Sequence, residues 1–181
     1  MSVMPASEFA AGFLSRFQVS AFRLETLDFY LADNEREPYR RFLAGQNHDP
    51  EWRRPWQRMV RGIYESGREI GRVHVVPEEL TDYLRFELTR AYPASVDAGE
   101  DVRILTRKEA DRIGLPHGED YWLFDDERSA ILRYTPDGEF VGVELATSDR
   151  VGQHVAWRQA AQAAAVPLYD YLEAATLAPA R

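Results

Sequence analysis

The stretch AILRYTPDGEFVGVEL, residues 130–145, decides much of the fold. Two runs rich in apolar and β-branched residues flank the tetrapeptide Thr135-Pro-Asp-Gly138. Proline presets the φ angle that a turn requires, and Asp137 and Gly138 tolerate the conformations that reverse the chain. We therefore predict a β-hairpin, with one strand over residues 130–134 and its antiparallel partner over residues 140–145.

Four segments before the hairpin also have the composition of β-strands. Each is short and contains β-branched or aromatic residues. Phe22 and Leu24 alternate with polar residues in the first of them, whereas Tyr121-Trp-Leu-Phe124 is almost wholly apolar, as expected near the middle of a sheet. The expected strands are residues 21–26, 72–76, 101–105 and 121–124.

Helical periodicity is strongest between Pro55 and Gly67. Proline suits the first turn of a helix and glycine its end, and the apolar residues between them recur at helical spacing: Trp56, Met59, Val60, Ile63 and Tyr64. Weaker patterns predict two helices with N-caps, one from Ser7 to Phe17 capped by Ser7, and one to Leu43, before Gly45, capped by Asp33 or Asn34. Further helices are predicted from Pro77 to a break near Pro93, from Lys108 to Ile113, and from Asp149 to Pro167.

The intermixed strands and helices predict the α+β (mixed α/β) class. We expect a single mixed β-sheet of about five to six strands with helices packed on it, and an antiparallel hairpin near the C-terminus. The chain has 181 residues, of which 45% are hydrophobic, so one domain can bury a sizeable core. We expect that domain over residues 1–172 and a disordered tail over residues 173–181.

The composition excludes several classes of protein. The chain has no cysteine, so disulfides, thiolate nucleophiles and cysteine zinc sites are absent. A net charge of −8 argues against direct nucleic-acid binding. No apolar run approaches the roughly 20 residues of a membrane span, and no secretion signal is present at the N-terminus. We therefore expect a cytoplasmic protein.

Charge is distributed unevenly along the chain. Residues 36–72 carry nine arginines and five acidic residues, whereas residues 73–181 carry eleven basic and twenty acidic residues. Two solvated faces would explain this pattern, and so would a basic surface for a partner protein. The residues proposed for such a surface are Trp52, Arg54, Arg58 and Arg61. Trp52 fits an interface and a core position equally well.

Glu87 occupies an anomalous position on the helix predicted after Pro77. Leu80, Tyr83, Leu84, Leu88 and Ala91 form its apolar stripe, and Glu87 falls inside that stripe. A carboxylate that faces a core costs several kcal/mol unless a cation or hydrogen-bond donors meet it. Either an internal arginine pairs with Glu87, or Glu87 belongs to a ligand site.

The second reading gives a pocket of carboxylates and arginine. Asp125 and Asp126 follow an apolar strand, and side chains at the carboxyl ends of strands line ligand crevices in open sheets. The candidate ligand-binding residues are Tyr83, Arg85, Glu87, Asp125, Asp126 and Glu144. The alternative is that Asp125 and Asp126 only begin a turn.

Other kinds of site find little support. The histidines are His48, His74, His117 and His154, and no two of them are spaced to share a helix face as metal ligands. The chain has no nucleophile elbow and no phosphate-binding glycine loop, and no serine has an obvious base partner. We therefore assign no metal, no cofactor and no catalytic residue.

Seven short motifs, taken together and in order, point to a family. They are Phe22-Arg-Leu-Glu25, Trp52-x-x-Pro55-Trp56, Arg72-Val-His-Val-Val76, Asp82-Tyr-Leu-Arg-Phe-Glu87, Ala98-Gly-Glu-Asp101, Tyr121-Trp-Leu-Phe-Asp125 and Phe140-Val-Gly-Val-Glu144. The chain resembles, from Phe22 to Leu172, an actinobacterial family known only as a domain of unknown function. Members are often encoded beside helix-turn-helix regulators, so the resemblance implies an accessory role in regulation.

The resemblance extends distantly to non-catalytic regulator domains of the phospholipase-D type. The parent enzymes carry a His-x-Lys pair, whereas Val75 and Val76 follow His74 here and Lys108 is the sole lysine. The resemblance therefore does not imply phosphodiesterase activity.

Two functions remain open. The leading hypothesis is a non-enzymatic cytoplasmic regulatory or accessory protein that binds a partner protein, such as a helix-turn-helix regulator, or a small ligand. The alternative is a small-molecule-binding enzyme that uses the carboxylate and arginine pocket, with a carboxylate as general base.

Overall fold

The computed structural model describes residues 4, 9–14, 16–30, 32–46 and 50–176. One seven-stranded sheet has the order β6-β5-β4-β1-β2-β3-β7. Strands β1, β2 and β3 are parallel, and the other pairs are antiparallel. The strands are β1 (Ser20–Glu25), β2 (Glu69–Val76), β3 (Asp101–Thr106), β4 (Asp120–Phe124), β5 (Arg128–Tyr134), β6 (Phe140–Leu145) and β7 (Val166–Pro167).

The predicted class and the mixed sheet are confirmed, with one strand more than expected. The predicted hairpin is β5 and β6, and the apolar segment Tyr121–Phe124 lies in β4, inside the sheet. The additional strand is β7, which is two residues long and pairs with β3 at the sheet edge. So short a segment has no period to detect, and it contains a proline, which is confined to edge strands.

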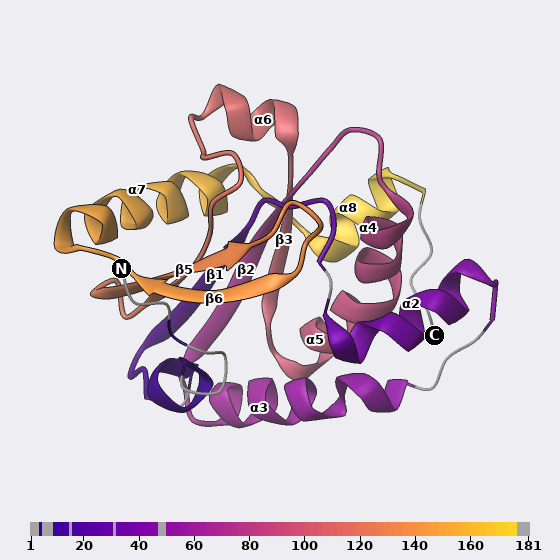
Figure 1. Ribbon diagram of the computed structural model, residues 1–181, viewed down its shortest axis with the longest axis horizontal. Coiled ribbons are helices and arrows are strands. Elements are labelled where there is room, and N and C mark those ends of the chain that lie inside the picture. Colours follow the sequence, from indigo (N-terminus) through magenta and orange to yellow (C-terminus); the bar gives the residue numbers. More distant parts are fainter. Residues whose placement is uncertain (1–3, 5–8, 15, 31, 47–49, 177–181) are drawn as a thin grey trace.

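Helical segments connect the strands and cover both faces of the sheet (Figure 1). The α-helices are α2 (Arg36–Leu43), α3 (Arg54–Glu65), α4 (Asp82–Phe86), α5 (Tyr92–Ala98), α6 (Arg107–Arg112), α7 (Ser148–Ala164) and α8 (Leu168–Ala174). Shorter segments are the π-helical η1 (Ala10–Leu14) and η4 (Glu87–Ala91) and the 3-10 turns η2 (Asp33–Glu35) and η3 (Pro50–Arg53). None of the helices within these ranges is long and apolar enough to cross a bilayer.

The two faces of the sheet differ in composition. On the face toward α6 and α7, which we call the α7 face, apolar side chains such as Leu24, Val73 and Leu123 form a continuous core. On the opposite face, called the α3 face, α3 packs against the start of the strands. Figure 1 shows α3 and α7 on opposite sides of the sheet. Because side chains alternate along a strand, each central strand contributes to both faces.

Helix α3 begins and ends close to where its sequence predicts. Pro55 lies in its first turn, and Gly67, just beyond its end, has a φ of 77°. Val60 and Ile63 are buried against the sheet as expected. Tyr64, in contrast, is 65% exposed, so its assignment to the buried stripe was wrong. Tyr64 lies one residue beyond Ile63, which turns it off the face that meets the sheet.

The helix predicted to break near Pro93 instead continues through it. Thr81 caps α4 by accepting a hydrogen bond from the Leu84 amide, and the π-helical segment η4 joins α4 to α5. Pro93 directly follows this π-helical turn, so the helix continues through a residue that cannot donate a backbone hydrogen bond to the preceding turn. The helix ends only at Gly99, whose positive φ of 110° is a conformation that glycine adopts readily. Glu87 begins the π-helical segment.

Three local predictions concern chain ends and caps. Ser7, the expected N-cap, lies outside the described residues. Asp33 and Asn34 lie in the 3-10 turn η2 and make no side-chain cap to α2, so their assignment as caps was wrong. Helix α8 extends to Ala174, two residues into the segment expected to be a tail.

Candidate functional site

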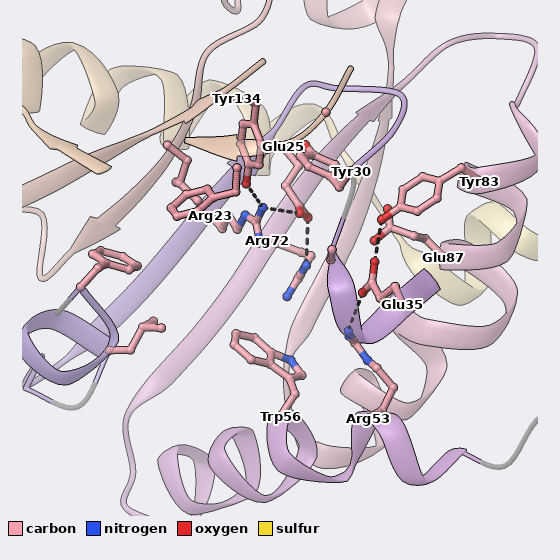
Figure 2. Close-up of a pocket in the computed structure, with 16 residues that line it drawn as sticks. Arg23, Glu25, Tyr30, Glu35, Arg53, Trp56, Arg72, Tyr83, Glu87 and Tyr134 are labelled. Carbon is pink, nitrogen blue, oxygen red and sulfur yellow. Dashed lines mark hydrogen bonds and ion pairs between the residues drawn. The ribbon is translucent and has the colours of Figure 1, made fainter. Parts of the chain in front are cut away.

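A cavity of about 350 Å³ opens on the α3 face, above the carboxyl end of β1 (Figure 2). Its size falls within the range of about 300–1,000 Å³ typical of small-molecule sites. One part of its wall is charged and another is aromatic and aliphatic. The lining residues are Phe9, Leu14, Arg23, Glu25, Tyr30, Ala32, Glu35, Arg53, Trp56, Arg72, Tyr83, Glu87, Leu132, Tyr134, Gly138 and Phe140.

The floor of the cavity is a buried network on β1 and β2. Arg23 Nη2 lies 2.9 Å from Glu25 Oε1, and Arg72 Nη1 donates to Glu25 Oε2 at 2.9 Å. Arg72 Nε donates to Glu100 Oε1 at 2.6 Å. Arg23 and Glu25 alternate along β1 with Phe22 and Leu24, so the strand places its charges on the α3 face and its apolar residues on the α7 face.

Electrostatics keep this network ionised. Burial alone would raise the pKa of Glu25, but the guanidinium groups of Arg23 and Arg72 outweigh that effect and hold the pKa well below its ordinary range. Arg72 also lies over the rings of Trp56 and Tyr92, with its guanidinium carbon 5.5 and 5.0 Å from their centroids. The floor is therefore held in one arrangement before any ligand arrives.

A second charged pair lies on the opposite wall, between η2 and η3 (Figure 2). Arg53 Nη1 donates to Glu35 Oε1 over a long 3.4 Å, and its Nη2 donates to Ser95 Oγ at 2.9 Å. Tyr83 donates to Glu35 Oε2 at 2.7 Å. The Nε atom of Arg53 is buried and has no hydrogen-bond partner among the described residues.

Glu87 lies in the cavity wall beside Tyr92 and His74. The Tyr92 hydroxyl lies 3.3 Å from Glu87 Oε2, 3.0 Å from Glu25 Oε2 and 2.7 Å from His74 Nδ1. Burial, and next the nearby carboxylates of Glu35 and Glu25, raise the pKa of Glu87 well above its ordinary value. The shift favours the neutral carboxylic acid, and in that form Glu87 can donate a hydrogen bond.

Aromatic side chains close the remaining wall. The rings of Tyr30 and Tyr134 meet edge to face with their centroids 5.2 Å apart, and Tyr134 packs against Phe140 at 5.6 Å. The Tyr134 hydroxyl accepts a hydrogen bond from Arg23 Nη2 at 3.2 Å. Trp56 is tethered by its indole N–H, which donates to Glu100 at 2.9 Å. The cavity thus suits a molecule with a polar head and a flat apolar body.

Two of the six candidate ligand-binding residues line the cavity, namely Tyr83 and Glu87. Arg85 is half-buried on α4 but does not line it. Glu144 lies on β6, where it accepts hydrogen bonds from Arg133. The structure therefore does not gather the six residues into one pocket.

Asp125 and Asp126 lie at the other end of the strands. Both have a positive φ in the turn after β4. Asp125 accepts hydrogen bonds from the backbone amides of Gln18, Val19 and Ser20, and Asp126 pairs with Arg158. Because β4 runs antiparallel to β1, its carboxyl end lies at the amino end of β1, away from the cavity.

Sequence reasoning missed most of the charged wall. Arg23, Glu25 and Arg72 lie in segments that were correctly predicted as strands, but their inward orientation was not inferred. In β1, Arg23 and Glu25 alternate with Phe22 and Leu24, which is also the pattern of a strand with one solvent-exposed face, so the sequence gives no signal of their burial. Glu35 and Arg53 come from short 3-10 segments, for which the sequence offers no comparable period.

The four residues proposed for a partner surface have different environments. Trp52 is half-buried and stacks on Phe86, with ring centroids 5.6 Å apart. Arg54 forms an ion pair with Glu51. Arg58 and Arg61 are exposed on α3. The basic surface therefore exists on α3, while the ring of Trp52 packs inward.

A serine, a histidine and a glutamate line up under α7, apart from the cavity. The Ser129 hydroxyl lies 2.6 Å from His154 Nδ1, and His154 Nε2 lies 2.9 Å from Glu119 Oε1. Ser129 is 3% exposed and His154 is fully buried, stacked on Tyr121 at 3.9 Å. A nucleophilic serine needs room for a substrate carbonyl, and this one is covered by α7. The arrangement is structural.

Comparisons with known proteins give a family and no activity. Residues 7–173 match the family model described as Domain of unknown function (DUF6879), and the chain belongs to this family. A search of the curated proteins found no match.

Proposed function

We propose that this protein is a non-enzymatic regulatory or accessory protein that senses a small molecule bound in the cavity on the α3 face. The observation that carries this proposal is the charged wall. Glu25 and Arg72 are buried on a sheet face that apolar side chains could fill, with half-buried Arg23 beside them and buried Glu87 on the adjoining segment η4.

Stability alone does not account for such a wall. Removing an arginine and its carboxylate from water costs several kcal/mol per ion, and apolar side chains of similar volume are often as stabilising or more so. Strongly shifted pKa values in a concave site are also typical of functional residues. The pKa values of Glu25 and Glu87 shift in opposite directions within one cavity.

The proposal is tested by native mass spectrometry of protein purified from its own host. We expect a retained small molecule in the wild type and its loss in Arg53→Gln, because Arg53 lines the cavity. Arg58→Gln is the matched control, since Arg58 is exposed on α3. Protein that carries no molecule, and that no fraction of a host metabolite extract stabilises against heat, would overturn the proposal.

An enzymatic role is the second candidate, and Tyr92 supplies the observation that favours it. Its hydroxyl lies within 3.3 Å of both Glu25, whose pKa is lowered by Arg23 and Arg72, and Glu87, whose pKa is raised by burial. Opposed pKa shifts of this kind separate the base from the acid in carboxylate enzymes. Incubating the identified molecule with the protein distinguishes the two roles, because a sensor returns it unchanged.

The partner surface proposed for regulation is the exposed side of α3, which carries Arg58 and Arg61. Charge reversal of Arg54, Arg58 and Arg61 to glutamate should abolish capture of an acidic partner protein while the fold persists. Each site lies on the surface, where a substitution changes stability by about 0.5 kcal/mol or less. Unchanged capture of the partner would show that the surface lies elsewhere.

A further inference from the structure

We infer that the molecule bound in the cavity is a small organic acid with a flat apolar body, whose carboxylate is held at the Arg53 wall. This inference rests on the proposed ligand-binding function and specifies the chemical class of the ligand. It follows from a count of hydrogen-bond donors and acceptors in the wall, from the geometry of one ion pair, and from the position of the apolar side chains.

Three carboxylates of the charged wall each accept at least two hydrogen bonds. Glu25 accepts from Arg23, Arg72 and Tyr92. Glu35 accepts hydrogen bonds from Arg53 and Tyr83. Glu100 accepts one from Arg72 and another from Trp56. Yet the Nε atoms of Arg23 and Arg53 have no partner among the described residues. Buried donors without acceptors are costly, so the wall favours a ligand that supplies acceptors.

In its neutral form, which burial favours, Glu87 adds a donor beside these two nitrogens. A protonated carboxyl group donates one hydrogen bond, and Glu87 lies in the cavity wall beside Tyr83 and Tyr92. A cationic ligand would need a carboxylate to receive it. Glu25 is already held by two arginines, and Glu35 by Arg53 and Tyr83, so an ammonium group would have to displace an existing donor.

Arg53 has the longest ion pair of the three arginines, 3.4 Å against 2.9 Å or less for Arg23 and Arg72. Arg72 is fixed by bonds of 2.6 and 2.9 Å and lies over two aromatic rings. The contact between Arg53 and Glu35 is 3.4 Å, and its guanidinium is anchored at the other end by Ser95. A ligand carboxylate can therefore receive the Arg53 guanidinium at a small loss of existing bonding, and charge-assisted pairs of this kind are strong.

The apolar part of the lining determines the body of the ligand. Trp56 lies close to the charged wall, and Phe9, Leu14, Leu132 and Phe140 lie on the side toward β5 and β6. Figure 2 shows the side chains of Trp56 and Arg53 pointing into the cavity from neighbouring positions. A planar ring in contact with Trp56 would place a carboxylate on a short linker toward Arg53.

Three matched probes test the inference: 3-phenylpropionate, 3-phenylpropanamide and 3-phenylpropylamine. They share a body and differ in head-group charge. Titrations followed by ligand-observed NMR should show that the acid binds about ten- to a hundredfold more tightly than the amide, because hydrogen bonds to charged groups contribute about 1.5–3 kcal/mol. The amine should bind most weakly. Arg53→Gln should remove the preference for the acid, and Arg58→Gln should preserve it.

The outcomes separate this inference from the proposed function. An amine or amide that binds as tightly as the acid would overturn the inference and leave the proposed function standing. So would a host-retained molecule without a carboxylate. Failure of all three probes to bind would also overturn the inference, and the absence of any retained host molecule alongside it would overturn the proposed function as well.

Discussion

Both faces of the central sheet are covered by helices, but different kinds of side chain lie on them. On the α7 face, Phe22, Leu24, Val73 and Val75 meet an apolar helix surface and leave little polar surface to satisfy. On the α3 face, residues from the same two strands form an ion network around a cavity. Neighbouring residues on one strand therefore lie in different environments, one in the apolar core and one at the cavity, because alternate side chains point to opposite faces.

Polar groups occur on both faces, but they differ in how completely they are hydrogen-bonded and in whether they border the cavity. Under α7, His154 is stacked on Tyr121 and bridged by Ser129 and Glu119, and none of the three lines the cavity. On the α3 face, the charged groups border open volume, and two arginine nitrogens there lack partners within the described residues. A saturated polar cluster indicates structure, whereas an incompletely satisfied cluster beside a cavity indicates binding.

The largest expected effect is on the α3 face. Arg72→Ala should lower the free energy of unfolding by about 3–5 kcal/mol, because it leaves Glu25 and Glu100 buried without that cation. Urea unfolding followed by circular dichroism measures the change.

The double variant Arg72→Met/Glu100→Gln provides the control for this prediction. It removes one charge of each sign, while Glu25 retains Arg23. We expect it to recover more than half of the stability that Arg72→Ala loses. If the double variant were less stable than Arg72→Ala, the network would be a source of net stability, and the contrast between the two faces would fail.

An intermediate effect is expected under α7. Ser129→Ala should cost about 1–3 kcal/mol, because it leaves His154 Nδ1 and the Trp122 carbonyl without their buried partner. Ser148→Ala, at the exposed start of α7, should change stability by about 0.5 kcal/mol or less. Ligand binding in the cavity should be unaffected by either change. Labelling of Ser129 by a fluorophosphonate would contradict the structural role assigned to it.

The sequence predicts the sheet better than it predicts the cavity, for a physical reason. The hairpin at residues 130–145 pairs segments that are close in sequence, which turn chemistry reveals. The strand around Phe22 is revealed by the alternation of its own residues, although its partners β2 and β4 are distant in the chain. The cavity wall joins β1 and β2 to η2, η3 and α4, and no local pattern records which elements will meet. Charges at Arg23 and Glu25 look like the solvent side of a half-buried strand.

Glu87 and Asp125 show which candidate site residues a local sequence pattern identifies correctly and which it does not. Glu87 was identified because an acidic residue interrupted a helical stripe, which is a local feature, and it lines the cavity. Asp125 was selected because it follows a strand, but the rule about strand ends holds for strands that run in the same direction. Strand β4 pairs antiparallel with β1, so its end lies away from the cavity.

The smallest expected effect is a dependence of folding stability on pH that comes from Glu87 alone. The unfolded chain has this carboxyl ionised well below pH 7, whereas the folded protein favours its protonated form, since its pKa is raised by burial and next by Glu35 and Glu25. The folded state therefore binds the extra proton, and stability must fall as pH rises, by at most about 1.4 kcal/mol per pH unit, until the folded pKa is passed.

The slope is best measured above neutrality. The pKa values of His74 and His154 are lowered by burial, so their opposite contribution, a gain of stability with rising pH, is complete near neutrality. Glu87→Gln keeps a neutral side chain of the same shape, so it should flatten the slope and be the more stable protein at high pH. Exposed Glu139→Gln should retain the wild-type slope. Parallel slopes for the wild type and Glu87→Gln would mean that Glu87 is ionised in the folded protein and adds no donor on the α3 face.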